Sequence, residues 1–116
     1  MRNLFFIIAL LALAANHAHG ATAEPSAKVF KSRGATQCEP TSGTPPEMMG
    51  KELEKAGITV SSIACGQDGR MYAALCGSPD GKINIFEIPE RKIPQASTLG
   101  FAKLSSLHDA KETPCQ

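Results

Sequence analysis

The chain has 116 residues with 12 basic and 11 acidic side chains, and 42% of its residues are hydrophobic. This length suits one small domain, and the near-neutral charge without a lysine or arginine cluster argues against nucleic acid or an anionic membrane surface as a partner. One tyrosine and no tryptophan leave few aromatic side chains to anchor sugars or stacked bases.

The N-terminus has the features of a secretory signal peptide. Arg2 precedes an apolar run over 4–15, and small residues follow at positions suited to cleavage after Gly20 or Ala23. The run is shorter than the roughly 20 residues that a membrane-spanning helix needs. We therefore expect a signal peptide over 1–23, a secreted or periplasmic mature protein, and no membrane insertion after cleavage.

A strand and a helix are expected next. The strand is predicted over 28–38 from its apolar residues, and the helix over 45–56 from apolar side chains three and four residues apart. Thr44 and Glu47 have the spacing of a capping box, and the proline that follows Thr44 suits the first helical turn. Gly57 is suited to the left-handed conformation that ends a helix.

Three further strands and a second helix are predicted from the patterns that follow. Strands are expected over 58–65, 70–76 and 82–88, separated by glycine-containing turns. The third of these has apolar residues on both faces, which is typical of an interior strand. A short helix over 94–99 is expected to end at Gly100.

This order of elements predicts a small α+β domain over 24–104, with a mixed sheet of about four strands and two helices on one face. A helix between the first two strands permits a right-handed parallel crossover, so these two strands are expected to pair side by side. The polar residues 105–116 are expected to form a loose tail unless Cys115 ties them down.

Four cysteines, Cys38, Cys65, Cys76 and Cys115, indicate a disulfide-stabilised domain, because an even number in a short exported chain is typical of a disulfide framework. A thiolate metal site or a redox pair normally has two cysteines within a few residues, whereas the closest two here lie eleven positions apart. The favoured pairs are Cys65 with Cys76 and Cys38 with Cys115, with the other two pairings left open.

Segments 65–70 and 76–82 resemble each other, since each has cysteine, glycine, a short spacer, Asp-Gly and a basic residue. Asp68 and Asp80 could face each other across a calcium ion, but such a site needs six or more oxygen ligands, and these segments lack them. Asp-Gly is also a preferred turn pair, which is the favoured interpretation.

Residues that could carry catalysis are scarce. His17 and His19 lie in the predicted signal peptide, which leaves His108 as the one histidine of the mature chain. The sequence offers no nucleophile beside a histidine and no convincing carboxylate pair. We therefore expect no enzyme activity, no catalytic residue, and no cofactor or metal.

These patterns together predict a non-enzymatic exported module that binds a protein partner, with residues 66–81 as the presented surface. Arg70, Tyr72, Asp68 and Asp80 are the candidate binding residues. Loops held by disulfides are preorganised, which lowers the cost of association, and an inhibitor of an exported protease is one special case. A calcium or small-ligand binder and a thiol-active redox protein are the alternatives.

Overall fold

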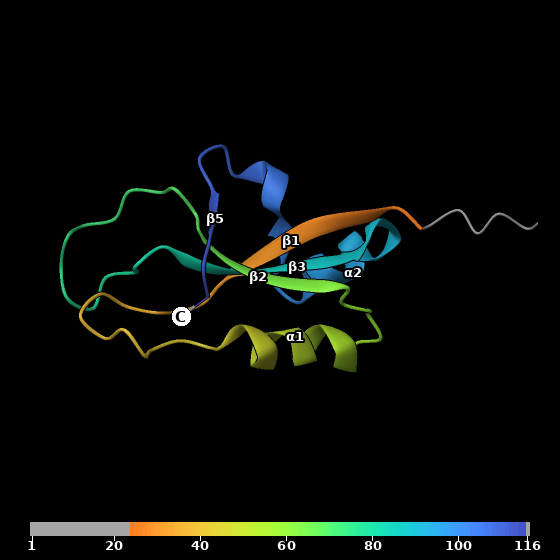
Figure 1. The fold of residues 1–116 in the computed structure, drawn as a ribbon, viewed down its shortest axis with the longest axis horizontal. Helices are drawn as coiled ribbons and strands as arrows, with labels where there is room; N and C mark the ends of the chain where they lie inside the picture. Colours follow the sequence, from red (N-terminus) through yellow and green to blue (C-terminus); the bar gives the residue numbers. More distant parts are fainter. Residues whose placement is uncertain (1–23, 116) are drawn as a thin grey trace, which may run out of the picture.

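The computed structural model describes residues 24–115, so the predicted signal peptide lies outside the described part of the chain. Within that part, one antiparallel sheet of five strands, in the order β4-β1-β3-β2-β5, packs with two helices (Figure 1). The strands are β1 (Ser26–Ser32), β2 (Ser62–Gln67), β3 (Lys82–Pro89), β4 (Ala102–Lys103) and β5 (Lys111–Thr113). The helices are α1 (Pro46–Lys55) and α2 (Ile93–Thr98), with the 3-10 turns η1 (Glu90–Lys92) and η2 (Leu104–Ser106). The predicted α+β class is confirmed, with five strands rather than about four.

The central strand is β3, as its apolar residues on both faces predict. It pairs with β1 along almost its whole length and with all of β2. Its side chains alternate between the faces, with Phe86 and Ile88 on one face and Ile83 and Ile85 on the other, and all four are buried. Both faces of the sheet must therefore be covered by other parts of the chain.

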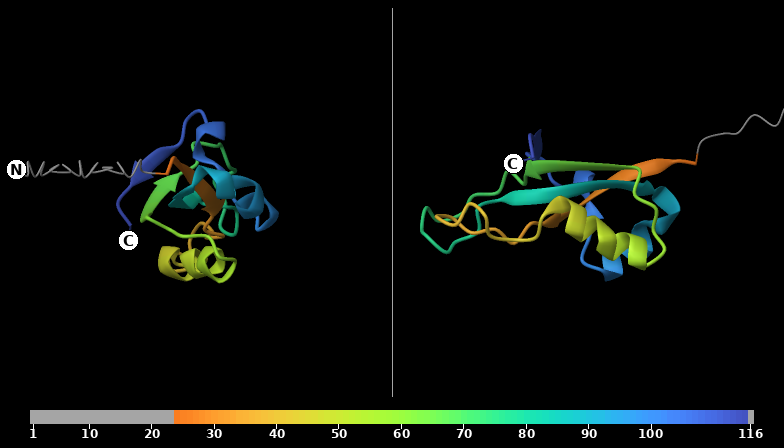
Figure 2. Two further views of the ribbon diagram at one scale, coloured as in Figure 1. Left: turned by 90° about the vertical axis from the view of Figure 1, so that its right-hand side faces the viewer. Right: turned by 60° about the horizontal axis from the view of Figure 1, so that its bottom comes forward.

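Both helices cover the face that carries Phe86 and Ile88 (Figure 2). The Phe101 ring packs edge-on against Phe86, with 5.7 Å between the ring centroids. At the end of α1, the Ile58 amide donates to the Leu53 carbonyl at 3.0 Å, so the helix ends where Gly57 predicts. The buried core on this face consists of Val29, Met49, Leu53, Ile58, Phe86, Ile88, Ala96 and Phe101.

The start of α1 differs from the predicted capping box. The helix begins at Pro46, and no side chain caps it. Thr44 is instead tied to the sheet, because its amide donates to the Arg33 carbonyl at 2.8 Å and its carbonyl accepts from the buried Asn84 side chain at 2.9 Å. These two bonds, rather than a capping side chain, position the start of the helix against β1 and β3.

The second face of the sheet is covered by residues 104–113. They run from β4 at one edge to β5 at the other, and Lys28 of β1 forms an ion pair with Glu112 of β5 at 2.6 Å. The Lys111 backbone passes so close to β2 that a Cβ on Gly66 would lie 2.5 Å from the Lys111 carbonyl oxygen. The segment is therefore part of the folded domain, as expected if Cys115 ties it down.

Two expectations about the sheet are wrong. The strands β1 and β2 run in the same direction, but β3 lies between them, so they form no parallel pair and the sheet is antiparallel rather than mixed. Residues 70–76 form no strand, because β2 pairs directly with β3 and residues 68–81 are the long connection between them.

Two disulfide bonds join Cys38 to Cys76 and Cys65 to Cys115. The predicted disulfide framework is confirmed, but the favoured pairing of Cys65 with Cys76 and Cys38 with Cys115 is wrong. Cys65 in β2 lies opposite Thr113 in β5, which brings Cys115 to it. The β2–β3 connection carries Cys76 away from the sheet to the loop that contains Cys38.

The two bridges also indicate where the protein works. Disulfides form and persist in oxidising compartments, so two of them indicate an extracellular or periplasmic setting. Among the helices of residues 24–115, none is long and apolar enough to cross a membrane.

Candidate functional site

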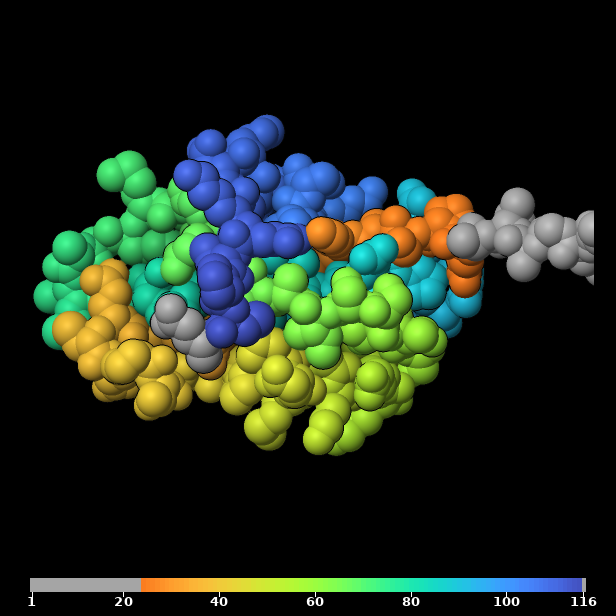
Figure 3. Space-filling model, viewed as in Figure 1, coloured from red at the N-terminus to blue at the C-terminus, as the bar shows by residue number. Residues whose placement is uncertain are grey.

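Two loops, residues 34–45 and 68–81, form a lobe that projects from one end of the sheet (Figure 1). The Cys38–Cys76 disulfide joins them, and the backbone of Gln37 exchanges two hydrogen bonds with the second loop, at 2.9 and 3.2 Å. Figure 3 shows the two segments packed against each other at this end of the molecule. The lobe is therefore one cross-linked unit rather than two independent loops.

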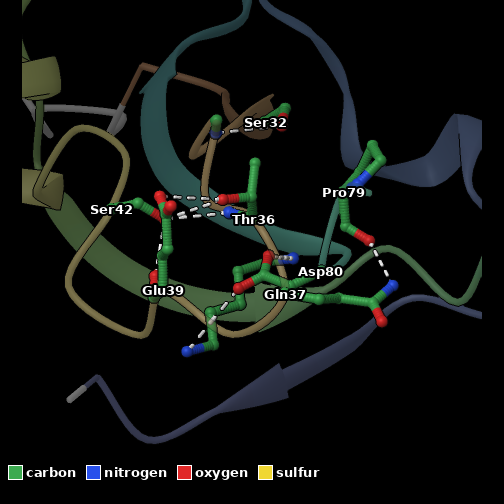
Figure 4. A network of polar contacts seen from close by, with 9 residues as sticks. Ser32, Thr36, Gln37, Glu39, Ser42, Pro79 and Asp80 are labelled. Carbon is green, nitrogen blue, oxygen red and sulfur yellow. Dashed lines mark hydrogen bonds and ion pairs between the residues drawn. The ribbon is translucent and has the colours of Figure 1, made fainter. Parts of the chain in front are cut away.

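The side chain of Gln37 holds the second loop in place. Its Nε2 donates to the carbonyl of Pro79 at 3.1 Å (Figure 4) and to that of Ala73 at 2.8 Å, and its Oε1 accepts from the Leu75 amide at 3.1 Å. One side chain thereby fixes the backbone of the second loop at three points. The first loop is held by hydrogen bonds among Thr36, Glu39 and Ser42 (Figure 4).

The opposite end of the second loop is fixed by Asp68, which is only 6% exposed. Its carboxylate accepts from the Arg70 amide at 2.8 Å and from the Tyr72 hydroxyl at 2.5 Å, so both oxygens have partners, as a buried charge requires. At Gly69, φ is +75° and a Cβ would lie 2.3 Å from the Asp109 carbonyl oxygen, so only glycine fits there.

Exposed apolar side chains lie between these two fixed points. Met71 is 97% exposed, Leu75 64% and Tyr72 36%. Burying a methionine or leucine side chain stabilises a protein by about 1.5–3 kcal/mol, and the lobe forgoes that stabilisation at both positions. The Met71 and Leu75 side chains stay exposed because the bonds of Asp68 and Gln37 hold the loop backbone in place. The lobe therefore presents apolar side chains to solvent on a fixed backbone.

The residues predicted to bind are only partly brought together. Asp68, Arg70 and Tyr72 form one cluster at the base of the second loop. Asp80 instead accepts from the Lys82 amide at 2.9 Å within its own turn, and its carboxylate lies 3.8 Å from the Lys82 ammonium. Asp68 and Asp80 thus each accept a backbone hydrogen bond within their own Asp-Gly turn.

Three residues of the lobe, Gln37, Met71 and Leu75, are missed by sequence reasoning. Gln37 lies 36 positions from Ala73, which its side chain binds, so no local pattern could place it there. Met71 and Leu75 fall in the predicted strand 70–76, where alternate side chains would be buried. The available signal was an apolar run between two Asp-Gly turns, which describes a presented loop equally well.

The state of the lobe can be read from Tyr72, because it is the one tyrosine in the sequence. Its hydrogen bond to the Asp68 carboxylate, and then its partial burial, raise the pKa of Tyr72 above the usual value near 10, which the Arg70 guanidinium offsets in part. The neutral phenol is thus favoured in the folded state. This contribution to stability is complete below pH 10 and is lost as the pH rises through the raised pKa.

Asp68→Asn is expected to bring the pKa of Tyr72 back down toward 10, because the charged acceptor is removed. Tyrosinate absorbance measures this titration directly, since the chain has no tryptophan. Asp80→Asn is the matched control, because it changes the other Asp-Gly turn and is expected to leave the titration of Tyr72 unchanged. Identical titrations for the wild type and Asp68→Asn would show that the bond is absent in solution.

A second feature is a cavity of about 230 Å³ at the ends of β2, β3 and β5. Two cationic residues line it, and the Arg33 Nε is buried without a hydrogen-bond partner in the described part of the chain. Lys82, in contrast, already has a carboxylate nearby. A small anion is the ligand that fits this charge. The lining residues are Arg33, Cys65, Gly66, Gln67, Lys82, Ile83, Thr113 and Pro114.

The described residues offer no cluster of metal ligands and no free thiol. Over 24–115, no three histidine, cysteine, aspartate or glutamate side chains lie close enough to share a metal ion. All four cysteines are in disulfide bonds, so thiol chemistry would first require the reduction of a bridge.

The chain has no match among protein-family models, curated proteins or solved structures. A function therefore has to be proposed from its own residues. The lobe combines exposed apolar side chains with a backbone that is fixed by a disulfide and by hydrogen bonds.

Proposed function

We propose that this protein is an exported, non-enzymatic module that binds a protein partner through the lobe, with Met71 and Leu75 as the main apolar contacts. The observation that carries the proposal is the 97% exposure of Met71 on a loop fixed at both ends. A few large side chains near the centre of an interface supply most of the binding energy in protein complexes. Met71 and Leu75 are placed to do so.

A fixed loop binds at a smaller entropic cost than a mobile one. Ordering one flexible side chain at an interface costs about 0.5–1.5 kcal/mol, and ordering the backbone costs about 1–2 kcal/mol per residue. In the lobe, the Cys38–Cys76 bridge and the bonds of Gln37 and Asp68 are made in advance. Most of the energy from burying Met71 is therefore available for binding.

The non-enzymatic part of the proposal is supported by the surroundings of His108. This side chain is exposed between η2 and β5, and no hydrogen bond joins it to a serine, threonine or cysteine in the described part of the chain. The neighbouring Ser106 hydroxyl donates to the Lys103 carbonyl at 2.7 Å instead. Nucleophilic catalysis needs a base within hydrogen-bond reach of the nucleophile, so the proposal assigns a binding role.

Met71→Asp is expected to weaken partner binding at least about tenfold, because a carboxylate is costly to desolvate in an apolar contact. Met48→Asp is the matched control, since Met48 is 60% exposed on α1, outside the lobe. The wild type and both variants are immobilised, exposed to envelope and secreted proteins of the source cell, and compared by quantitative mass spectrometry.

The proposal requires a protein that is retained by the wild type and by Met48→Asp and lost with Met71→Asp. Equal retention of every captured protein by all three would contradict it.

A further inference from the structure

We infer that the lobe is a substrate-like inhibitor of an exported endopeptidase that has an apolar specificity pocket, and that Met71 is the side chain that enters this pocket. The inference rests on the proposed function, because it takes the lobe as the binding surface and names the class of partner. Its support comes from the exposure of Met71 on the loop, from the residues that flank Met71, and from the bonds that cross the peptide bond after Met71.

The loop leaves Met71 accessible to a peptidase. Residues 70–73, after the Asp68-Gly69 turn, belong to no helix or strand, and Met71 projects from this stretch. Endopeptidases bind substrates as extended strands and select them by a pocket for one side chain. An exposed, irregular segment with one projecting side chain is what such a cleft recognises.

The residues that flank Met71 are both tied to Asp68, Tyr72 by its side chain and Arg70 by its backbone amide. The Tyr72 hydroxyl donates to the Asp68 carboxylate at 2.5 Å, and the Arg70 amide donates to the same carboxylate at 2.8 Å. The Arg70 side chain is exposed. Among these three neighbours, Met71 is the large apolar side chain that is almost fully exposed, so it is the one placed to enter an apolar pocket rather than an acidic one.

Most of the bonds that fix this loop cross the Met71–Tyr72 peptide bond; the bond from the Arg70 amide to the Asp68 carboxylate lies wholly before it. Both disulfides cross the peptide bond, because Cys38 and Cys65 precede it while Cys76 and Cys115 follow it. The side-chain bond from Asp68 to Tyr72 also crosses it, as do the bonds from Gln37 to residues 73, 75 and 79. A cut at this position would therefore leave two fragments that stay in place.

Because of these crossing bonds, the loop would inhibit a peptidase instead of being hydrolysed as a substrate. When a serine peptidase attacks, its hydroxyl oxygen bonds to the Met71 carbonyl carbon, the bond to the Tyr72 nitrogen breaks, and that nitrogen takes the serine proton through the histidine. In an ordinary substrate the new amine leaves, and water completes hydrolysis. Here the Tyr72 amine is held beside the acyl carbon, so it re-forms the peptide bond and returns the proton before water attacks.

The inference is tested with chymotrypsin and subtilisin, whose pockets are apolar, and with trypsin, whose pocket is acidic. We expect the wild type to inhibit at least one of the first two competitively at micromolar or lower concentration. Met71→Asp is expected to raise that inhibition constant at least about 100-fold, and Met71→Lys to transfer inhibition to trypsin. Met48→Lys, on α1, is the control that is expected to change nothing.

Intact mass after long incubation gives a second readout. The expected product is a species heavier by one water that stays folded, and that reduction separates into fragments ending at Met71 and beginning at Tyr72. The inference is overturned if neither chymotrypsin nor subtilisin is inhibited, or if the lobe is digested like a linear peptide. In that case, loss of partner capture by Met71→Asp would still leave the proposed function standing, whereas unchanged capture would remove both.

Discussion

Replacing Cys65 and Cys115 by serine is expected to lower the free energy of unfolding by about 4 kcal/mol. The bridge joins residues 50 positions apart, and the freedom that the unfolded chain regains without it gives an effect of this size. Because a small domain has a total stability on the order of 5–10 kcal/mol, the variant is expected to be close to unfolding. Urea titration followed by circular dichroism measures the shift in midpoint.

The full effect is expected because the native structure gains little freedom when this bridge is removed. Cys115 directly follows the segment that covers Ile83 and Ile85, and that segment cannot leave the sheet without exposing both side chains. The loss of the bridge therefore acts mainly on the unfolded chain. A measured loss well below 4 kcal/mol, together with exposure of these isoleucines to hydrogen exchange, would show that the segment detaches in the native state instead.

Local patterns predicted the elements whose stability comes from the core. The two helices and β3 lie within one or two residues of their expected positions, because apolar periodicity and the glycines that end each helix are local signals. The start of α1 was not predictable in this way. Thr44 is bound by Arg33 and Asn84, which are distant in sequence, and these contacts replace the capping box that the local pattern favours.

The loop proposed as the binding surface falls within the predicted segment 66–81, but the way it is built could not be predicted from local patterns. An apolar run such as 71–75 reads as a strand unless it is known that β2 and β3 already pair without it. The predicted disulfide pairing depends on the same question, because Cys76 lies beside Cys65 only if residues 71–75 form a strand of the sheet. The segment 104–113, which covers the second face of the sheet, was also not predictable, because its strand Lys111–Thr113 has three residues, charged side chains and no apolar pattern.

Replacing Cys38 and Cys76 by serine is expected to open the lobe while the sheet stays folded. The separation of 38 residues gives nearly the same loop entropy in the unfolded chain as the other bridge does. The lobe, however, contributes no residue to the main core cluster, so the native lobe regains freedom as well. The loss in free energy of global unfolding is therefore expected to be smaller than for the Cys65–Cys115 bridge.

The rate of trypsin cleavage after Arg70 measures this opening of the lobe, because trypsin recognises the arginine side chain and not Met71. Cleavage is expected to be at least about tenfold faster in the Cys38→Ser, Cys76→Ser variant, since it requires a locally open loop whose population rises without the bridge. Gln37→Ala keeps the bridge and is expected to give a smaller increase. Equal rates in the wild type and the double variant would mean that Gln37 and Asp68 alone hold the loop, and that the bridge acts only on the unfolded chain.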